Sequence, residues 1–572
     1  MTTTNTGHAV RREEDVPAIM RDGTILRADV YRPQGTGPFP VALLRTPYNK
    51  KHPREIAHAE ELASFGYIVA MQDMRGRHAS DGEYDLHFGP GHGDDNILDG
   101  YDTVEWAANL PDSAGTVGTW GVSHMAWTQW KLAPTRPPHL RAMFAGGVAP
   151  DSRVAGPGIF QRDRRLQWWY CTIAPDTRRR LGLPGPKTVE EAQTAWDSVE
   201  RGKWLWFEPM CEFPEEFSGG LYKFWHYYLA RQHCNLYRLD GKYHEIDVPN
   251  YHATSWYDRM WSCLDLYHGM IAHGRTEMAR KSQKLIIGPW PHGFEFIRKV
   301  GAVDFGPEAE RSSAQLIARW FDYWLKGIDN GIMKEPLVSI FVMGENKWRY
   351  ENEWPLARTV YTDYYFHSGG HANTPFGDGV LSPERPAVET PDTYVYDPRD
   401  PVMSIHLPGG GAGPGDMRSH NYRKDILVYQ TPPLERETEV TGPIVATLYT
   451  ATSALDTDWT VRLTDVHPDG LAVNLSFGIV RARYRESFDN STLLEPGRVY
   501  EYKITVGPTS MLFKAGHRIR VDISSSDFPM YDRNHNTGLN CWEDPTFMKA
   551  RQTIFHDPAH PTRILLPIVP RP

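Results

Sequence analysis

Strands and helices alternate along the first 145 residues, and this alternation constrains the fold more than any other feature of the sequence. Two amphipathic segments, 58–64 and 101–110, are typical of helices. The runs between them have the length and composition of buried strands: 39–44, 67–71, 116–120, 140–145 and, much later, 285–287. Because a hairpin is expected at 16–32 and strands alternate with helices after it, the pattern predicts a mostly parallel, helix-covered sheet.

Residues 150–245 interrupt this alternation. The segment is rich in Arg, Trp and Tyr, and it predicts helices without strands between them. An insertion between sheet strands is typical of a cap over an active site, although a helical subdomain with its own core would give the same pattern. We favour a cap, and we expect some of its aromatic side chains to line a substrate pocket; the candidates are Trp168, Trp169, Trp204, Phe207 and Trp225.

A helix at 312–328 ends the alternating region, and short strands separated by turns follow from residue 336 onward. Strands are expected at 337–342, 444–449, 460–463 and 519–523, a pattern typical of a β-sandwich or jelly roll. The chain has 572 residues, more than the ~250–300 residues that one core supports. We therefore predict an α/β fold with a parallel, helix-covered sheet in two parts, 1–149 and 246–335, a helical cap at 150–245 and a jelly roll at 336–572.

Composition excludes several classes of function. The net charge is −9 and the charges are interspersed, so the basic stripe of a nucleic-acid-binding protein is missing. The five cysteines are scattered and form no C-x-x-C pair, which favours a reducing compartment over a disulfide framework or a zinc site. The sequence also lacks a secretory h-region and a run of ~18 apolar residues. We expect a cytoplasmic protein without a membrane or nucleic-acid partner, and a homo-oligomer stays open.

The strongest local signal for chemistry is the segment Gly118-Thr119-Trp120-Gly121-Val122-Ser123-His124-Met125-Ala126. A strand runs into Gly121 and a helix leaves after Ser123, as in the nucleophile elbow of α/β hydrolases. Met125 stands where the simple G-x-S-x-G motif has its second glycine. A helix N-cap serine would give the same local pattern, so the interpretation depends on partner residues elsewhere.

Two later segments supply those partners in the chain order of this fold class, serine, acid, histidine. Asp258 follows a strand-like stretch, although a solvated loop carboxylate would look the same locally. His292 lies in Gly288-Pro289-Trp290-Pro291-His292, just beyond a buried strand that Gly and Pro end. Serine is a weak nucleophile until a base takes its proton, and His292 would be that base, with Asp258 fixing its tautomer. The sequence therefore predicts the catalytic residues Ser123, Asp258 and His292.

An acyl-transfer site also needs donors for the developing oxyanion. The backbone N–H of His124 is one candidate. The second donor usually comes from the loop after an early strand, here Arg45-Thr46-Pro47-Tyr48. Because Pro47 has no N–H, we expect the Tyr48 hydroxyl to take that role.

At these residues the chain resembles the cocaine esterase-like hydrolases, which are grouped with the X-Pro dipeptidyl-peptidases and the α-amino acid ester hydrolases. The segment at 45–48 is similar to the family's R-x-P-Y, whose tyrosine is an oxyanion donor, and 73–82 is similar to a structural segment around the site. The remaining matches are the W-Y-D acid at 256–258, the G-P-W-x-H base at 288–292 and part of a C-terminal jelly roll at 508–526.

The chain departs from the family pattern G-x-S-Y-x-G at two elbow positions, His124 and Ala126, and Ser255 stands where glycine is usual. The backbone N–H at position 124 can still donate to the oxyanion, because it does not depend on the side chain at that position. The His124 imidazole beside Ser123 is expected to alter pH dependence or specificity.

The resemblance implies hydrolysis of an ester or amide through an acyl-enzyme, with no cofactor. An X-Pro dipeptidyl-peptidase or aminoacyl peptidase stays open, as does an acyltransferase on the same triad. A peptidase would need acids for a substrate ammonium; the cap offers Glu208, Glu212, Glu215 and Glu216, which we expect to be solvated. A carbohydrate-binding protein fits the jelly roll alone. A metal site would draw on His87, His92, Asp94 and Asp95, which lack helical H-x-x-x-H spacing, so no metal is expected.

Overall fold

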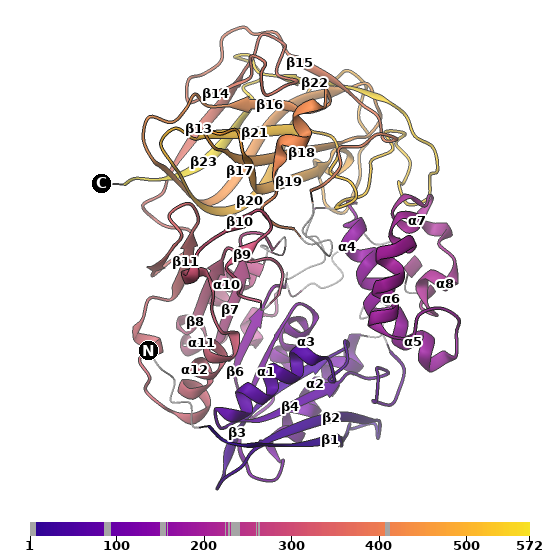
Figure 1. Ribbon diagram of the computed structural model, residues 1–572, viewed down its shortest axis with the longest axis vertical. Coiled ribbons are helices and arrows are strands. Elements are labelled where there is room, and N and C mark those ends of the chain that lie inside the picture. The colour runs from indigo at the N-terminus through magenta and orange to yellow at the C-terminus, as the bar shows by residue number, and fades with distance from the viewer. Residues whose placement is uncertain are drawn as a thin grey trace.

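The computed structural model describes residues 7–84, 93–148, 156, 158–222, 225–226, 229, 239, 241–258, 260, 263–293, 295–405 and 412–571. These residues form a ten-stranded sheet, an eleven-stranded sheet and a helical segment beside both (Figure 1). The candidate metal residues His87 and His92, and the side chains of Asp94 and Asp95, lie outside the described residues. In the described part of the chain, no helix combines the length and the apolar character needed to cross a bilayer.

The first sheet has the order β1-β2-β4-β3-β5-β6-β7-β8-β11-β12, and its strands from β4 to β11 run parallel. The antiparallel hairpin of β1 and β2 was predicted from its turn and is confirmed. The strands are β1 (Val10–Ile19), β2 (Ile25–Pro33), β3 (Phe39–Thr46), β4 (Ile68–Asp73), β5 (Ser113–Val122), β6 (Leu140–Gly146), β7 (Asn250–Ser255), β8 (Gln283–Gly288), β11 (Val338–Val342) and β12 (Lys347–Glu351).

Helices cover both faces of this sheet, as the alternation predicted. One apolar core lies under α1 and α12, and another lies under α2, α3 and α10. The Ser312 side chain caps α12 by accepting from Gln315 N–H, and Gly327 ends that helix in the left-handed conformation that glycine adopts without strain. The helices are α1 (Pro53–Ser64), α2 (Gly93–Ala108), α3 (His124–Leu132), α10 (Leu264–His273), α11 (Glu277–Lys281) and α12 (Ser313–Lys326).

The inserted segment is helical in its described residues, as predicted, and contains no strand there. Figure 1 shows its helices as a separate group beside the first sheet and below the second. Its interior is an aromatic core that also receives Phe528 from the second sheet's region. The elements are α4 (Arg162–Gln167), the π-helical turn η2 (Trp168–Ile173), α5 (Ala174–Leu181), α6 (Val189–Ala195), η3 (Trp196–Glu200), α7 (Arg201–Trp206), η4 (Met210–Glu212) and α8 (Glu215–Ser218).

The second sheet is antiparallel apart from the pair β14–β16. It shares a continuous apolar core with the first sheet, to which Trp256 and Tyr257 contribute from the loop after β7. Its strands are β13 (Val360–His367), β14 (Val380–Ser382), β15 (Asp392–Tyr396), β16 (Leu427–Gln430), β17 (Thr438–Thr452), β18 (Asp458–Val466), β19 (Ala472–Arg481), β20 (Tyr500–Phe513), β21 (Arg518–Ser524), β22 (Ala550–Phe555) and β23 (Arg563–Val569).

One sequence-based assignment is wrong. The strand expected at 337–342 was assigned to the C-terminal β domain because it follows residue 336. Instead β11 pairs in parallel with β8, and β12 extends the first sheet beyond it. The sequence of a short apolar strand does not indicate which strand it pairs with, so the sheet that it joins is known only from the three-dimensional structure. The domain limits and the jelly-roll topology of the second sheet otherwise stay predictions.

Candidate active site

Ser123 lies on a tight turn between β5 and α3. Its backbone has φ 61° and ψ −125°, a conformation that is strained for a residue with a side chain. The turn closes because Gly121 has no Cβ; one added there would lie 2.6 Å from the Cβ of Met125. The Ser123 hydroxyl makes no helix-capping hydrogen bond. Ser123 therefore stands at the N-cap position of α3 without capping the helix through its side chain, so helix capping does not account for this serine.

Asp258 and His292 meet at the same edge of the sheet. Asp258 follows β7 and His292 follows β8, and these parallel strands are neighbours. His292 Nδ1 lies 2.8 Å from Asp258 Oδ2, and Asp258 Oδ1 accepts a hydrogen bond from Met260 N–H at 3.1 Å. Ser255 Oγ donates to the Pro291 carbonyl oxygen at 3.2 Å. The serine found at 255 in place of the family's glycine thus ties the acid's strand to the histidine's loop.

Gly147, directly after β6, completes this edge and was missed by the sequence analysis. Its φ is 55°, and an added Cβ would lie 3.0 Å from Asp258 Oδ2, 3.2 Å from His292 Cε1 and 2.8 Å from Val122 Cγ2. Only glycine fits this position without displacing the acid and the imidazole. The paired glycines that end the predicted strand at 140–145 were the available signal.

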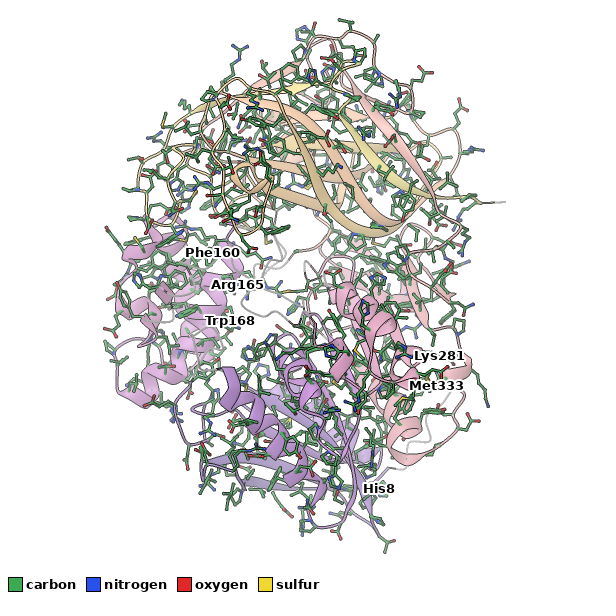
Figure 2. All side chains as sticks on the ribbon, turned by 180° about the vertical axis from the view of Figure 1, so that it is seen from behind. His8, Phe160, Arg165, Trp168, Lys281 and Met333 are labelled. Carbon is green, nitrogen blue, oxygen red and sulfur yellow. The ribbon has the colours of Figure 1, made fainter. Side chains whose placement is uncertain are left out.

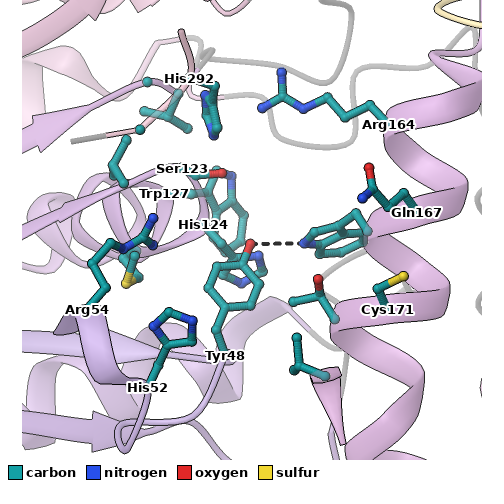
Figure 3. A pocket seen from close by; sticks show the side chains of 18 of the residues that line it. Tyr48, His52, Arg54, Ser123, His124, Trp127, Arg164, Gln167, Cys171 and His292 are labelled. Atoms are coloured by element: carbon teal, nitrogen blue, oxygen red, sulfur yellow. Dashed lines mark hydrogen bonds between the residues drawn. The ribbon is translucent and has the colours of Figure 1, made fainter. Parts of the chain in front are cut away.

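Tyr48 faces Ser123 from the loop after β3. The indole Nε1 of Trp168 donates a hydrogen bond to the Tyr48 hydroxyl oxygen at 3.1 Å, drawn as the dashed line in Figure 3. Burial raises the pKa of Tyr48, while hydrogen bonds with Trp168 and Ser123 act in the opposite direction. The hydroxyl therefore keeps its proton, and because its oxygen already accepts from Trp168, its O–H is available to a group beside Ser123.

Hydrogen bonds from Arg77 stabilise the loop that carries Tyr48. This buried side chain donates from Nε to the Pro47 carbonyl oxygen at 2.9 Å and from Nη1 to the Ile173 carbonyl oxygen at 3.0 Å. Arg77 thus connects the Tyr48 loop to the cap, in line with the structural role expected for its segment.

His124 begins α3, where the first backbone N–H groups of a helix have no acceptor within the helix. Its ring lies edge-on to Tyr48, with centroids 6.0 Å apart. Burial, followed by the charges of Arg77 and Arg45, lowers the pKa of His124 to about 3. The imidazole therefore stays neutral at ordinary pH, and the expected change in pH dependence does not follow from its titration.

These side chains surround a cavity of about 390 Å³ between the first sheet and the cap (Figure 3). The sheet side contributes Ser123, His292 and Tyr48, and the cap side contributes Arg164 and Trp168. Further lining residues are His52, Arg54, Glu55, Val122, His124, Met125, Trp127, Gly147, Val148, Arg165, Gln167, Cys171, Thr172, Val189, Gln193, Met260 and Gly293.

The aromatic residues proposed for the pocket divide into two groups. Trp168 lines the cavity, as Figure 3 shows. The prediction is wrong for Trp169, Trp204, Phe207 and Trp225, which pack with one another in the core of the cap. These rings pack inside the cap because its helices must bury their apolar faces against one another.

The acids proposed to receive an ammonium group do not line the cavity. Glu208 was expected to be solvated, but its side chain is only 7% exposed and forms ion pairs with Arg162 at 2.6 Å and Arg533 at 3.0 Å. It joins the cap to the β domain. Glu216 is exposed and pairs with Lys203 at 3.4 Å.

Burial and two arginines control the charge of the site. Burial, followed by the charge of Arg164, lowers the pKa of His292, although Asp258 opposes this. Burial acts to raise the pKa of Asp258, but the charge and hydrogen bond of His292 bring it below the ordinary value. His292 is therefore neutral and Asp258 ionised near neutral pH, which is the state that a general base requires.

One group of the described residues could hold a metal ion, and it lies in the second sheet. Asp465, His467 and His517 have ligand atoms within 4.8 Å of one another. His517 Nδ1 lies 2.9 Å from Asp465 Oδ1, and His467 Nε2 lies 3.3 Å from Asp465 Oδ2. None of the three lines the cavity, and no step of the chemistry below uses them.

Comparisons with known proteins cover the whole chain. Residues 22–294 match the family described as X-Pro dipeptidyl-peptidase (S15 family), and residues 330–565 match the X-Pro dipeptidyl-peptidase C-terminal non-catalytic domain. The chain is 35% identical to the cocaine esterase of Rhodococcus sp. (strain MB1 Bresler) over 590 residues, which is 96% of this chain and 97% of that esterase.

Two solved structures share the architecture from end to end. An aminopeptidase from the marine sediment archaeon Thaumarchaeota archaeon has a TM-score of 0.80 at 26% identity, covering 100% of this chain and 98% of its own. An α-amino acid ester hydrolase has a TM-score of 0.81 at 24% identity, covering 99% and 98%. The predicted fold class, an α/β-hydrolase sheet with an inserted helical cap and a C-terminal β domain, is confirmed.

Proposed function

We propose that this chain, which belongs to the S15 family of serine hydrolases, cleaves a carboxylic ester or amide through an acyl-enzyme formed on Ser123. The observation that supports this proposal most is the meeting of two features at one cavity. A strained serine that does not cap its helix faces the cavity, and the His292–Asp258 pair lines the same wall. A strained elbow is maintained only where the surrounding structure enforces it, and such strain clusters at functional sites.

In the first half of the reaction, Ser123 Oγ attacks the substrate carbonyl carbon while His292 Nε2 takes the hydroxyl proton. The Asp258 carboxylate accepts the hydrogen bond from Nδ1–H, which fixes the tautomer and stabilises the imidazolium that forms. His292 then gives its proton to the departing alcohol or amine. The carbon–leaving-group bond breaks, and the acyl group stays on Ser123.

The oxyanion of the tetrahedral intermediate would be held by two donors, the Tyr48 hydroxyl and the backbone N–H of His124. Trp168 supports the first, because its indole N–H occupies the Tyr48 oxygen and leaves the O–H to point at the substrate. Preorganised donors of this kind are worth about 3–4 kcal/mol each in related reactions. In the second half, water attacks the acyl-enzyme with His292 as base, and the acid is released.

A peptidase that recognises a substrate ammonium is the second candidate, since the family model and one solved structure are named for such activities. Among the described residues that line the cavity, Glu55 is the one carboxylate, and Arg54 pairs with it at 2.8 Å. This favours the esterase or amidase over the aminopeptidase. An acyltransferase would use the same residues, and products formed with added alcohols or amines distinguish it from a hydrolase.

We propose a small-molecule ester or amide as the partner, and not a nucleic acid, because the charges are interspersed and sum to −9. The scattered cysteines favour a cytoplasmic location. A homo-oligomer stays open.

The test is intact mass spectrometry after treatment with a fluorophosphonate. We expect one stoichiometric adduct on the wild-type protein, none on Ser123→Ala, and strongly slowed labelling of His292→Ala, which keeps the serine but loses the base. Ser198→Ala changes an exposed cap serine and is expected to label like the wild type. A folded wild-type protein that gives no adduct, or an adduct that persists in Ser123→Ala, would contradict the proposal.

A further inference from the structure

Two cationic side chains of the cap face the cavity. Arg164 and Arg165 are consecutive residues of α4, and both line the cavity together with Ser123. Figure 3 shows the Arg164 guanidinium reaching from the cap helix toward His292, and Figure 2 shows Arg165 and Trp168 on neighbouring turns of the cap. Helical spacing explains this, since residues three and four apart share a face. Arg164, Arg165 and Trp168 therefore form one wall.

Arg164 and Arg165 bring two cationic groups to that wall. The other charged lining pair, Arg54 and Glu55, neutralises itself through its ion pair. Arg164 forms no ion pair or hydrogen bond with any side chain that the structure describes, although it is half-buried. Burial lowers the pKa of Arg164, the charge of Asp258 opposes this shift, and the neighbouring charge of Arg165 acts in the same direction as burial. Retaining a half-buried guanidinium beside a second one is costly unless an anion compensates for it.

The position of Arg164 within the cavity indicates which part of a substrate it would meet. Its guanidinium points toward His292 in Figure 3, and its charge is the largest cause after burial that lowers the pKa of His292, so it lies on the side of the site where the base stands. In acyl transfer, the histidine hands its proton to the leaving group, so the leaving group must lie beside the imidazole. Arg165 lines the same cavity, and its charge acts on the pKa of Tyr48, of His124 and of His292.

We propose that Arg164, assisted by Arg165, forms a subsite for a carboxylate carried by the leaving group of the substrate. The preferred substrates would then be esters of hydroxy acids or phenolic acids, or amides of amino acids, cleaved to release an anionic alcohol or amine. This inference rests on the proposed function, because it takes His292 as the group that protonates the leaving group. The planar guanidinium suits a carboxylate, to which it can donate two parallel hydrogen bonds.

The kinetic test compares the acetyl esters of three para-substituted phenols whose substituents are anionic, neutral and cationic: 4-hydroxybenzoate, 4-hydroxybenzamide and tyramine. At pH 8, where His292 is neutral in every variant, we expect kcat/KM to favour the benzoate over the benzamide by about tenfold or more, as charged hydrogen bonds allow. Arg164→Gln should bring the two rates within about threefold by slowing the benzoate ester more than the benzamide ester, Arg165→Gln should act partially, and added salt should weaken the preference.

Arg179→Gln serves as the matched control, since Arg179 lies in the same cap but is exposed and pairs with Asp176 outside the cavity. It should keep the wild-type preference. Equal rates on the benzoate and benzamide esters in the wild type, a faster tyramine ester, or a preference that survives Arg164→Gln would overturn the inference while leaving the hydrolase proposal intact.

A binding measurement separates this inference from the catalytic proposal. Calorimetric titration of folded Ser123→Ala with 4-hydroxybenzoate needs no turnover. We expect it to bind at least tenfold more tightly than 4-hydroxybenzamide, and the double variant Ser123→Ala/Arg164→Gln to lose that difference. Equal affinity for the two compounds refutes the carboxylate subsite even if the serine proves inactive, whereas hydrolysis of none of the esters together with selective benzoate binding refutes only the proposed function.

Discussion

Replacing Tyr48 with phenylalanine removes one hydroxyl and keeps the ring that packs against His124. If the hydroxyl stabilises the oxyanion, the acylation rate should fall by about 10²–10³, the usual loss for one oxyanion donor of about 2.7–4 kcal/mol. The Michaelis constant should change little, because the donor acts on the transition state and not on the bound ester. The second donor, a backbone N–H, is unaffected by the change.

The structure also sets the cost of this substitution in stability. Trp168 Nε1–H loses the acceptor that lies 3.1 Å away. An orphaned donor costs about 1–3 kcal/mol when fully buried, but Trp168 lines the cavity, where water can replace the lost hydroxyl. The lower end, about 1 kcal/mol, is therefore expected. Trp168→Phe leaves the hydroxyl in place without its orienting partner, so it should slow acylation less than Tyr48→Phe does.

Stopped-flow release of 4-nitrophenol from an aryl ester measures acylation in the wild type, the two single variants and the double variant. The double variant should be no slower than Tyr48→Phe alone, because Trp168 acts through the hydroxyl. Tyr394→Phe deletes a buried hydroxyl that contacts Ser525 in the β domain at 2.9 Å, and it should not change the rate. An acylation rate of Tyr48→Phe within threefold of the wild type would refute the assigned role.

Three further outcomes are expected. Gly147→Ala adds a Cβ 3.0 Å from the Asp258 carboxylate at a positive φ, so it should lower kcat/KM at least tenfold and cost about 1–2 kcal/mol of backbone strain, measured by esterase assay and urea unfolding. The pKa of His292 is lowered, so kcat/KM should fall only below pH 6.5 as the imidazole protonates; a midpoint at or above 6.5 would contradict the buried, arginine-flanked base. Glu208→Gln leaves Arg533 without its countercharge and should destabilise the cap interface by about 3–5 kcal/mol, seen as faster proteolysis of the cap; unchanged proteolysis would argue against the ion pair.

Features that depend on neighbours in the chain were predictable. The elbow could be found because a strand, Gly121 and Ser123 in sequence leave the backbone one compact way to turn into a helix. The positions of Asp258 and His292 followed from strands that end just before them, since parallel strands bring their carboxyl ends to one edge. The same rule could have found Gly147.

The orientation of side chains in the cap could not be predicted in this way. Trp168 and Trp169 are adjacent and chemically identical, yet one lines the cavity and the other is buried in the cap core. A rotation of about 100° per residue separates them, and the π-helical turn that begins at Trp168 changes the phase of the helix. Periodicity alone therefore does not determine which ring meets the substrate.

The sequence by itself determined the strand and helix types, the elbow and the order of the catalytic residues, because these depend on local periodicity and turn chemistry. The tertiary structure alone decided contacts across long separations. Glu208 pairs with Arg533 from 325 residues away, and β11 joins the first sheet by pairing in parallel with β8. Arg164 faces His292 only because the cap folds over the carboxyl edge of the sheet. Such pairings are set by the free energy of the whole packed chain, and no short segment of the sequence contains it.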